Sequence, residues 1–247
     1  MRGWIVLLAA TLLAAGAACG SDDGATETAA SATASPVNEA PLGERYDGPA
    51  SRYAPQLDEV PGFLVIDAEQ TFPVGESGFW VLGPFQNTVE AQRLTPEWGY
   101  ESGYRIQFAP DGLLAGVMLG RYYATVEVYV FETPEGARAA YQRFFEVGEQ
   151  PEGVRRLEEV SGIGDEAAGW EVVQGTVGDS NVPATHHRVL LRRGNVIAVV
   201  TTFAAQPYAD PQHAIEMARI VDERIVGTRP SPTPTPFPTP GGLPSGS

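Results

Sequence analysis

The 247-residue chain has no lysine, one cysteine and three histidines, and each shortage argues against a class of protein. All 16 basic residues are arginines, against 31 acidic residues, so the formal net charge is −15. Binding to nucleic acid, or electrostatic attraction to an anionic membrane, needs a basic patch and is not expected. One cysteine excludes an intramolecular disulfide framework and a multi-cysteine metal site. With no histidine in a catalytic motif, a histidine-based hydrolase is not expected either.

Long hydrophobic runs are also scarce, and the one at the N-terminus is short. Residues 4–15 are almost entirely apolar, fewer than the roughly 20 residues that span a bilayer as a helix. A positive charge at Arg2 precedes this run, and the small residues 16–18 follow it, which is typical of a secretory signal.

The junction between these small residues and Cys19 resembles the bacterial lipoprotein signal, or lipobox. The resemblance implies that residues 1–18 are removed and that the Cys19 thiol carries a diacylglycerol. Several acyl chains would hold the protein firmly on the membrane. The alternative is ordinary cleavage after Ala17 or Ala18, which would give a secreted protein with a free Cys19.

Two segments lack the composition of a folded domain. Residues 19–45 have no aromatic residue and no hydrophobic periodicity, so we predict a flexible linker after the lipidated cysteine. Residues 229–247 are rich in proline and threonine and predict a disordered, extended tail. O-glycosylation, cell-wall contact or a proline-recognising partner are functional alternatives for this tail.

The segment between them, residues 46–228, is long enough for a well-packed core. Residues 104–108 alternate between apolar and polar side chains, and residues 124–131 are rich in β-branched and aromatic residues. Both patterns predict strands. Thr133 then predicts a helix N-cap, with Pro134 in the first position. The expected buried stripe of this helix consists of Ala137, Ala140, Tyr141, Phe144 and Phe145.

The second half of this segment repeats the order. Residues 187–192 and 196–203 predict a hairpin around the Gly194-Asn195 turn. Asp210 predicts a second helix N-cap, and Gly227 the end of that helix. We therefore predict an α+β domain, an antiparallel sheet with packed helices, built from two weakly repeated strand–strand–helix halves. The buried stripe of the second helix is expected to be Ala214, Met217, Ala218, Val221 and Ile225.

One series of motifs in this domain resembles a known group of domains. The series consists of the loop of residues 161–167, Trp170, the hairpin at residues 189–197 and the final capped helix. It is similar to the extracellular sensor-type domains of small actinobacterial lipoproteins and mycobacterial receptor serine/threonine kinases. The resemblance covers residues 123–227. It implies a non-catalytic α+β domain outside the membrane that binds a small envelope-derived ligand in a groove.

The residues offer few arrangements for chemistry. His186 and His187 are neighbours on an expected strand, so their side chains point to opposite faces. A metal site of His187, His213 and a carboxylate is conceivable, but we expect no metal and no cofactor. Asp165 and Glu166 follow two glycines and fit a hydrogen-bonded turn better than an acid–base pair. The candidate ligand-binding residues are Trp98, Tyr104, Trp170 and Arg192, because amphipathic aromatics are enriched at binding sites and an arginine can bind an anion.

We therefore expect a lipid-anchored lipoprotein on the extracytoplasmic face of the cell membrane. It would act as a non-catalytic binding or sensing module for an envelope small molecule or a protein partner, and it would not be an enzyme. The first alternative is a structural or assembly lipoprotein that presents a protein-interaction surface. A carboxylate-based hydrolase is the second.

Overall fold

The computed structural model describes residues 42–71, 88–110, 123–149, 153–177 and 181–230. All of them belong to one compact unit, Ala40–Ser247. The lipobox with Cys19, most of the expected linker and the tail from residue 231 onward lie outside the described residues. Within the described segments, no helix has the length and apolar character needed to cross a membrane.

The strands form one antiparallel sheet in the order β1-β2-β3-β7-β6-β5-β4. β3 and β7 lie at its centre, and β4 is a two-residue strand at one edge. The architecture confirms the α+β prediction. The strands are β1 (Phe63–Thr71), β2 (Tyr100–Pro110), β3 (Tyr123–Phe131), β4 (Arg155–Arg156), β5 (Glu166–Thr176), β6 (Pro183–Arg193) and β7 (Val196–Ala205).

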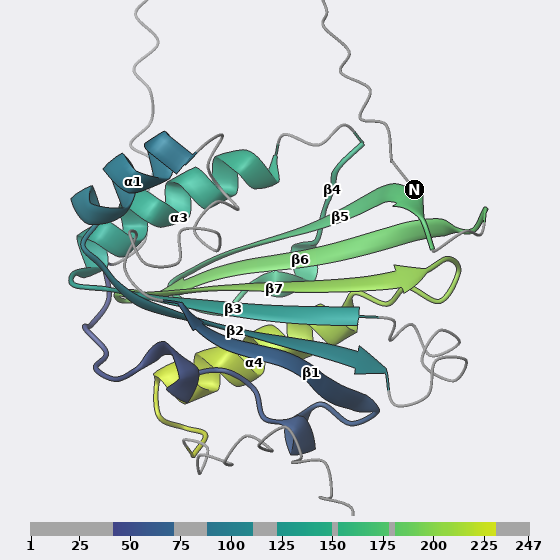
Figure 1. Cartoon of the computed structure of the whole chain (residues 1–247), viewed down its shortest axis with the longest axis horizontal. Helices are drawn as coiled ribbons and strands as arrows, with labels where there is room; N and C mark the ends of the chain where they lie inside the picture. Colours follow the sequence, from purple (N-terminus) through teal and green to yellow (C-terminus); the bar gives the residue numbers. More distant parts are fainter. Residues whose placement is uncertain (1–41, 72–87, 111–122, 150–152, 178–180, 231–247) are drawn as a thin grey trace, which may run out of the picture. The chain divides into compact units, whose positions relative to one another are not determined.

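Helices cover both faces of this sheet (Figure 1). α1 (Thr88–Glu97) and α3 (Pro134–Gly148) lie on one face, and α4 (Gln212–Ile225) lies on the other. The two-residue period of β3 fits this arrangement, because alternate side chains face opposite layers. Val126, Val128 and Val130 belong to the buried cluster that includes α4. Tyr129 and Phe131 belong to the cluster that includes α3.

Local signals place both long helices where the sequence predicts them. The Thr133 hydroxyl accepts a hydrogen bond from the Gly136 N–H at 3.1 Å, so Thr133 caps α3 as expected. The Asp210 carboxylate accepts from the Gln212 N–H at 2.9 Å, but α4 begins one residue later than expected, with Pro211 as the N-cap residue. All five residues of the predicted α4 stripe are buried.

The β6–β7 hairpin is confirmed, and it also holds the start of the domain. The Asn195 side chain accepts from the Tyr46 N–H at 2.6 Å and donates to the Tyr46 carbonyl at 3.2 Å. Arg192 donates to the Leu42 carbonyl at 2.7 Å. Residues 42–45, which we assigned to the linker, therefore pack against the folded body.

The two halves repeat their elements but not their geometry. The first half runs β1, α1, β2, β3 and then α3, and the second runs β5, β6, β7 and then α4. The halves meet through antiparallel pairing of β3 with β7, in which Val126 lies opposite Val200. Yet α3 and α4 lie on opposite faces of the sheet, and both pack on the strands β6 and β7 of the second half.

Candidate functional site

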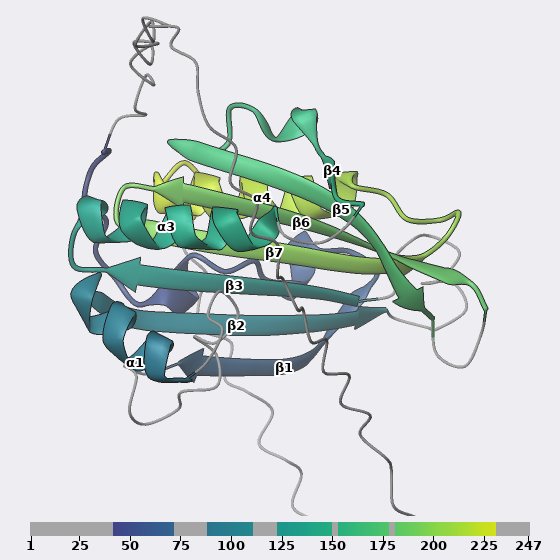
Figure 2. The ribbon, with the colours of Figure 1, turned by 90° about the horizontal axis from the view of Figure 1, so that it is seen from above.

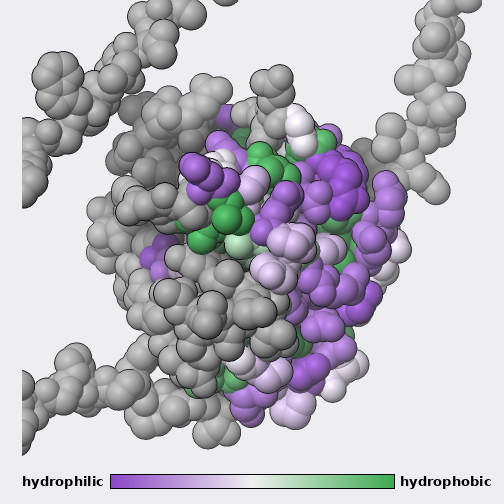
Figure 3. All heavy atoms as spheres, turned by 90° about the vertical axis from the view of Figure 1, so that its right-hand side faces the viewer, coloured by the Kyte–Doolittle hydropathy of each residue, from purple (hydrophilic) through white to green (hydrophobic). Residues whose placement is uncertain are grey.

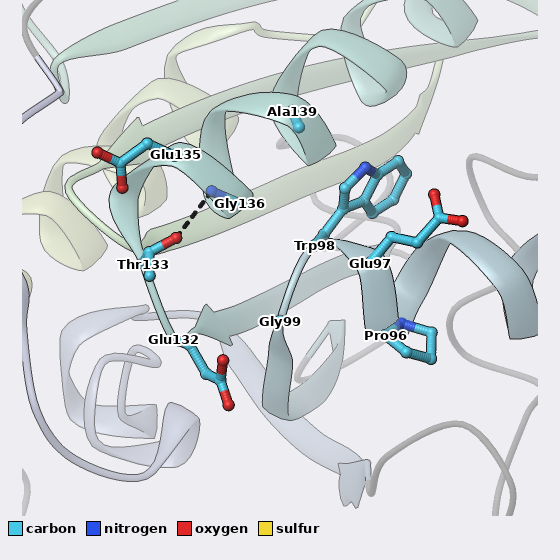
Figure 4. A pocket seen from close by; sticks show the side chains of 9 residues that line it. All are labelled: Pro96, Glu97, Trp98, Gly99, Glu132, Thr133, Glu135, Gly136 and Ala139. Atoms are coloured by element: carbon cyan, nitrogen blue, oxygen red, sulfur yellow. Dashed lines mark hydrogen bonds between the residues drawn. The ribbon is translucent and has the colours of Figure 1, made fainter.

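One hollow in the described part of the domain lies between the end of α1 and the start of α3. Its volume is about 340 Å³, and Trp98 is part of its lining. Figure 4 shows that the carboxylates of Glu97, Glu132 and Glu135 point in different directions. Glu97 also forms an ion pair with Arg93 at 3.2 Å. These polar groups do not converge on a common point, so this hollow is a weak candidate for specific binding.

The second hollow lies where the C-terminal part of α3 crosses the sheet, and we call it the α3 pocket. Figure 2 shows that α1 and α3 cover only one half of this face, so the strands extend beyond the end of α3. The pocket has a volume of about 40 Å³. Its lining consists of Phe144 and Val147 from α3, Glu127 from β3, Trp170 from β5, Arg188 and Leu190 from β6, and Val199 from β7.

The strand register explains why these side chains meet. Glu127 lies opposite Val199, and Val199 lies opposite Leu190, so the three form one row across the sheet on the α3 side. Arg188 is two residues from Leu190 and therefore faces the same side. Its row includes Trp170 on β5. The pocket thus has an apolar floor and wall, with one acidic and one basic group at its polar end.

Glu127 is the electrostatically unusual member of the pocket. Burial raises the pKa of its carboxyl group, and this effect outweighs the opposing influence of Arg188, Arg105 and a hydrogen bond with Tyr129. Arg188 acts on Glu127 from a distance, since no ion pair within 4.0 Å joins the two in the described structure. The Glu127 carboxylate has therefore lost part of its hydration, and the neighbouring groups do not fully offset that loss.

Arg188 is exposed, in contrast to the arginines of the nearby hairpin. Among the residues that the structure describes, it makes no hydrogen bond and no close ion pair. Arg193, by comparison, is bound by Asp222 at 2.8 Å and Asp165 at 3.0 Å. The guanidinium of Arg188 therefore keeps its donors for solvent or a ligand.

The four ligand-binding residues expected from the sequence do not come together. Trp170 contributes to the α3 pocket, but its side chain is 1% exposed and its indole N–H donates to Glu149. Trp98 lies in the larger hollow. Tyr104 packs against the buried cluster on the α4 side of the sheet. A ligand-binding role for the four residues as one site is therefore not supported by their placement.

Arg192 has a structural position. It is completely buried and donates to Glu166, to the Leu42 carbonyl and to the Gly194 carbonyl. Asp165 accepts from the Gly194 N–H at 2.7 Å, as expected for a hydrogen-bonded turn. This network ties the hairpin to the N-terminal segment, and the anion-binding role of Arg192 stays a prediction without geometric support.

The histidines are separated as their sequence positions predict. His187 is buried, and its Nε2 lies 3.0 Å from Glu171. His186 faces the α3 side, where its ring lies 4.8 Å from that of Phe203. Burial lowers the pKa of His186 and favours its neutral form. The described residues contain no group of three or more histidines, cysteines and carboxylates placed to hold a metal ion.

Sequence analysis missed Glu127 and Arg188, the two charged residues of the pocket. A signal for Glu127 was present, because it stands in the middle of a strongly apolar strand. Had β3 been placed at the centre of a sheet with helices on both faces, a charged residue there would have marked a functional position. That placement depends on the pairing of β3 with β7, which the local sequence does not encode.

Comparisons with known proteins give a similarity in structure but none in sequence family. No protein-family model and no curated protein sequence matches the chain. Among solved structures, the chain is similar to the extracellular domain of PknH from Mycobacterium tuberculosis, with a TM-score of 0.46 and 12% sequence identity over 75% of this chain and 100% of that chain. The expected resemblance to receptor-kinase sensor domains thus has a counterpart at low similarity. That similarity does not identify a ligand.

Proposed function

We propose that this protein is a non-catalytic binding module, anchored on the extracytoplasmic face of the cell membrane through Cys19, and that the α3 pocket receives a small ligand. The observation that carries the proposal is the combination of apolar walls with an acid and a base that are not in contact. Binding pockets generally pair apolar walls with a few placed polar groups. Perturbed carboxyl groups in clefts are also enriched at functional sites.

The same lining supports binding rather than catalysis. Glu127 is the one carboxylate among the described lining residues, and the set includes no serine, threonine, cysteine or histidine. Glycoside hydrolysis usually requires two carboxylates about 5–9 Å apart. Nucleophilic catalysis requires a nucleophile beside a base. The residues present favour recognition of a ligand.

A pocket-filling substitution tests this proposal. We expect a screen of envelope lipids, muropeptides, sugars and amino acids to find a compound that raises the melting temperature of the full chain. At 100 times its dissociation constant, such a ligand adds about 2.7 kcal/mol of stability. Val147→Trp should remove the shift, because the indole would fill the pocket, whereas Val173→Trp on the exposed end of β5 should keep it. Equal shifts in both variants would place the ligand elsewhere and contradict the proposal.

The anchor requires its own test. In the producing bacterium, we expect the protein to incorporate labelled palmitate and to enter the detergent phase in a phase-separation assay. Cys19→Ser should abolish both, because the acyl chains need the thiol. Globomycin, which blocks lipoprotein signal cleavage, should cause the unprocessed form to accumulate. Palmitate incorporation by Cys19→Ser would refute anchoring at this residue.

A protein-interaction surface is the alternative function, and two exposed valines favour it. Val173 on β5 is 51% exposed, and Val182, just before β6, is 39% exposed. However, Figure 3 shows that the described surface on that side is mainly hydrophilic, with small separate hydrophobic groups. Interaction sites usually present a larger continuous apolar patch. The pocket is therefore the better-supported site.

A further inference from the structure

We propose that the α3 pocket selects a zwitterion, specifically an α-amino acid with a short aliphatic side chain. This inference rests on the proposed function and names the ligand class of the same site. In the bound state the ligand's ammonium group would face Glu127, its carboxylate would face Arg188, and its side chain would contact Phe144, Val147 and Val199.

The spacing of the two charged side chains is the first support. Glu127 and Arg188 line one pocket and influence each other electrostatically, yet they do not form an ion pair within 4.0 Å. Because both side chains line the same pocket, a ligand bound there can contact both of them. An α-amino acid carries an ammonium and a carboxylate on one carbon, so it can complete both ion pairs at once.

The net charge of the pocket supports the same class. A ligand with only a negative charge would pair with Arg188 but would be repelled by Glu127. A ligand with only a positive charge would pair with Glu127 and be repelled by Arg188. The repulsion by Glu127 acts in a partly desolvated environment, where charge interactions are stronger than in water. A zwitterion avoids both penalties.

The size and character of the remaining walls select the side chain. The free volume of about 40 Å³ holds only a few non-hydrogen atoms, since one water molecule needs about 10–15 Å³ on the same measure. Phe144, Val147, Leu190 and Val199 offer no polar partner in that space. A branched side chain of three or four carbons fits both limits, while the ammonium and carboxylate would lie outside this volume, at the rim where Arg188 is exposed. Leucine is the natural probe.

Calorimetric titration of the full chain with three related compounds tests this inference. Leucine carries both charges, 4-methylpentanoate lacks the ammonium group, and 3-methylbutylamine lacks the carboxylate. We expect leucine to bind at least tenfold more tightly than either relative. Glu127→Gln and Arg188→Gln should each weaken leucine binding at least tenfold. Arg219→Gln, which changes an exposed arginine on α4, should leave it unchanged.

The outcomes separate this inference from the proposed function. If 4-methylpentanoate binds as tightly as leucine, zwitterion selection is wrong, although the pocket remains a binding site. If none of the three compounds binds, the amino-acid class is wrong, and the broader screen with Val147→Trp decides the function. If leucine binds wild type and Val147→Trp equally, the inference and the choice of pocket both fail.

Discussion

Two buried charges show how differently a single residue can contribute to this protein. The Arg192 guanidinium is enclosed by Glu166, Asp165 and two backbone carbonyls. We expect Arg192→Met to destabilise the fold by about 3–5 kcal/mol, because it leaves buried carboxylates without their partner. Urea denaturation at pH 7 measures this loss, with Arg219→Met as the exposed control. A loss no larger than that of the control would show that the network does not stabilise the domain.

Replacement of Glu127, in contrast, should stabilise the fold. Its pKa is raised in the folded state by burial, so the folded protein binds the proton more tightly than the unfolded chain, and stability falls as pH rises through that window. We expect Glu127→Gln to be more stable than wild type at pH 7, by about 1.4 kcal/mol for each unit of that shift. The gain should disappear about one unit or more below pH 4.3, the usual pKa of an unfolded glutamate, where both states of the wild type are protonated. Urea denaturation across this range measures it, and a gain that is independent of pH would contradict the explanation.

At the scale of elements, the β6–β7 turn is fixed by a close backbone contact. Gly194 has a φ of +54°, and a Cβ there would collide with the Glu44 carbonyl. Gly153 has a φ of +75° with no atom near its Cβ position, so it is a matched control. We expect both alanine variants to lose about 1–2 kcal/mol through left-handed strain. Gly194→Ala should lose a further 1–3 kcal/mol or so through overpacking. Urea denaturation of both variants measures the difference in their stability losses. Equal losses would show that the segment around Glu44 can move away from residue 194 without a loss of stability.

The elements themselves were largely predictable. The N-cap Thr133, the hairpin at Gly194 and the stripe of α4 each depend on residues close together in sequence, so their patterns are complete in a short window. The candidate site was not predictable in this way. Its lining comes from five elements, and the face that each residue presents depends on the central pairing of β3 with β7. Tyr104 and Trp170 were therefore grouped although they belong to separate clusters on the two sides of the sheet.

For the molecule as a whole, acid should be the destabilising condition. Burial would raise the pKa of Glu59, but hydrogen bonds from Arg224, the Gln56 N–H and Arg229 overcome this effect and lower it. The pKa of Glu171 is also lowered, mainly by Arg155. A carboxyl group with a lowered folded pKa stabilises the fold above its unfolded pKa, and this contribution is lost as pH falls through the folded value. Stability should therefore decline below about pH 4.5.

Glu59→Gln tests this account. We expect it to cost about 2 kcal/mol at pH 7 and less at pH 3, because protonation of wild-type Glu59 removes the same charge as pH falls through its lowered folded pKa. Thermal denaturation across this range measures the effect, and Glu158→Gln is the control because Glu158 is exposed. An equal cost at both pH values would assign the effect to packing instead of charge.

The central pairing of β3 with β7 also sets an order of events for a chain that is synthesised from its N-terminus. β1, β2 and β3 emerge well before β7, which supplies the partner of β3. Until then β3 is an open edge of alternating valines, the kind of edge that pairs with other chains. When the β6–β7 hairpin forms, β7 pairs with β3 and covers this edge. β7 thus protects β3 from self-association, and a nascent chain halted before Val196 would lack that protection.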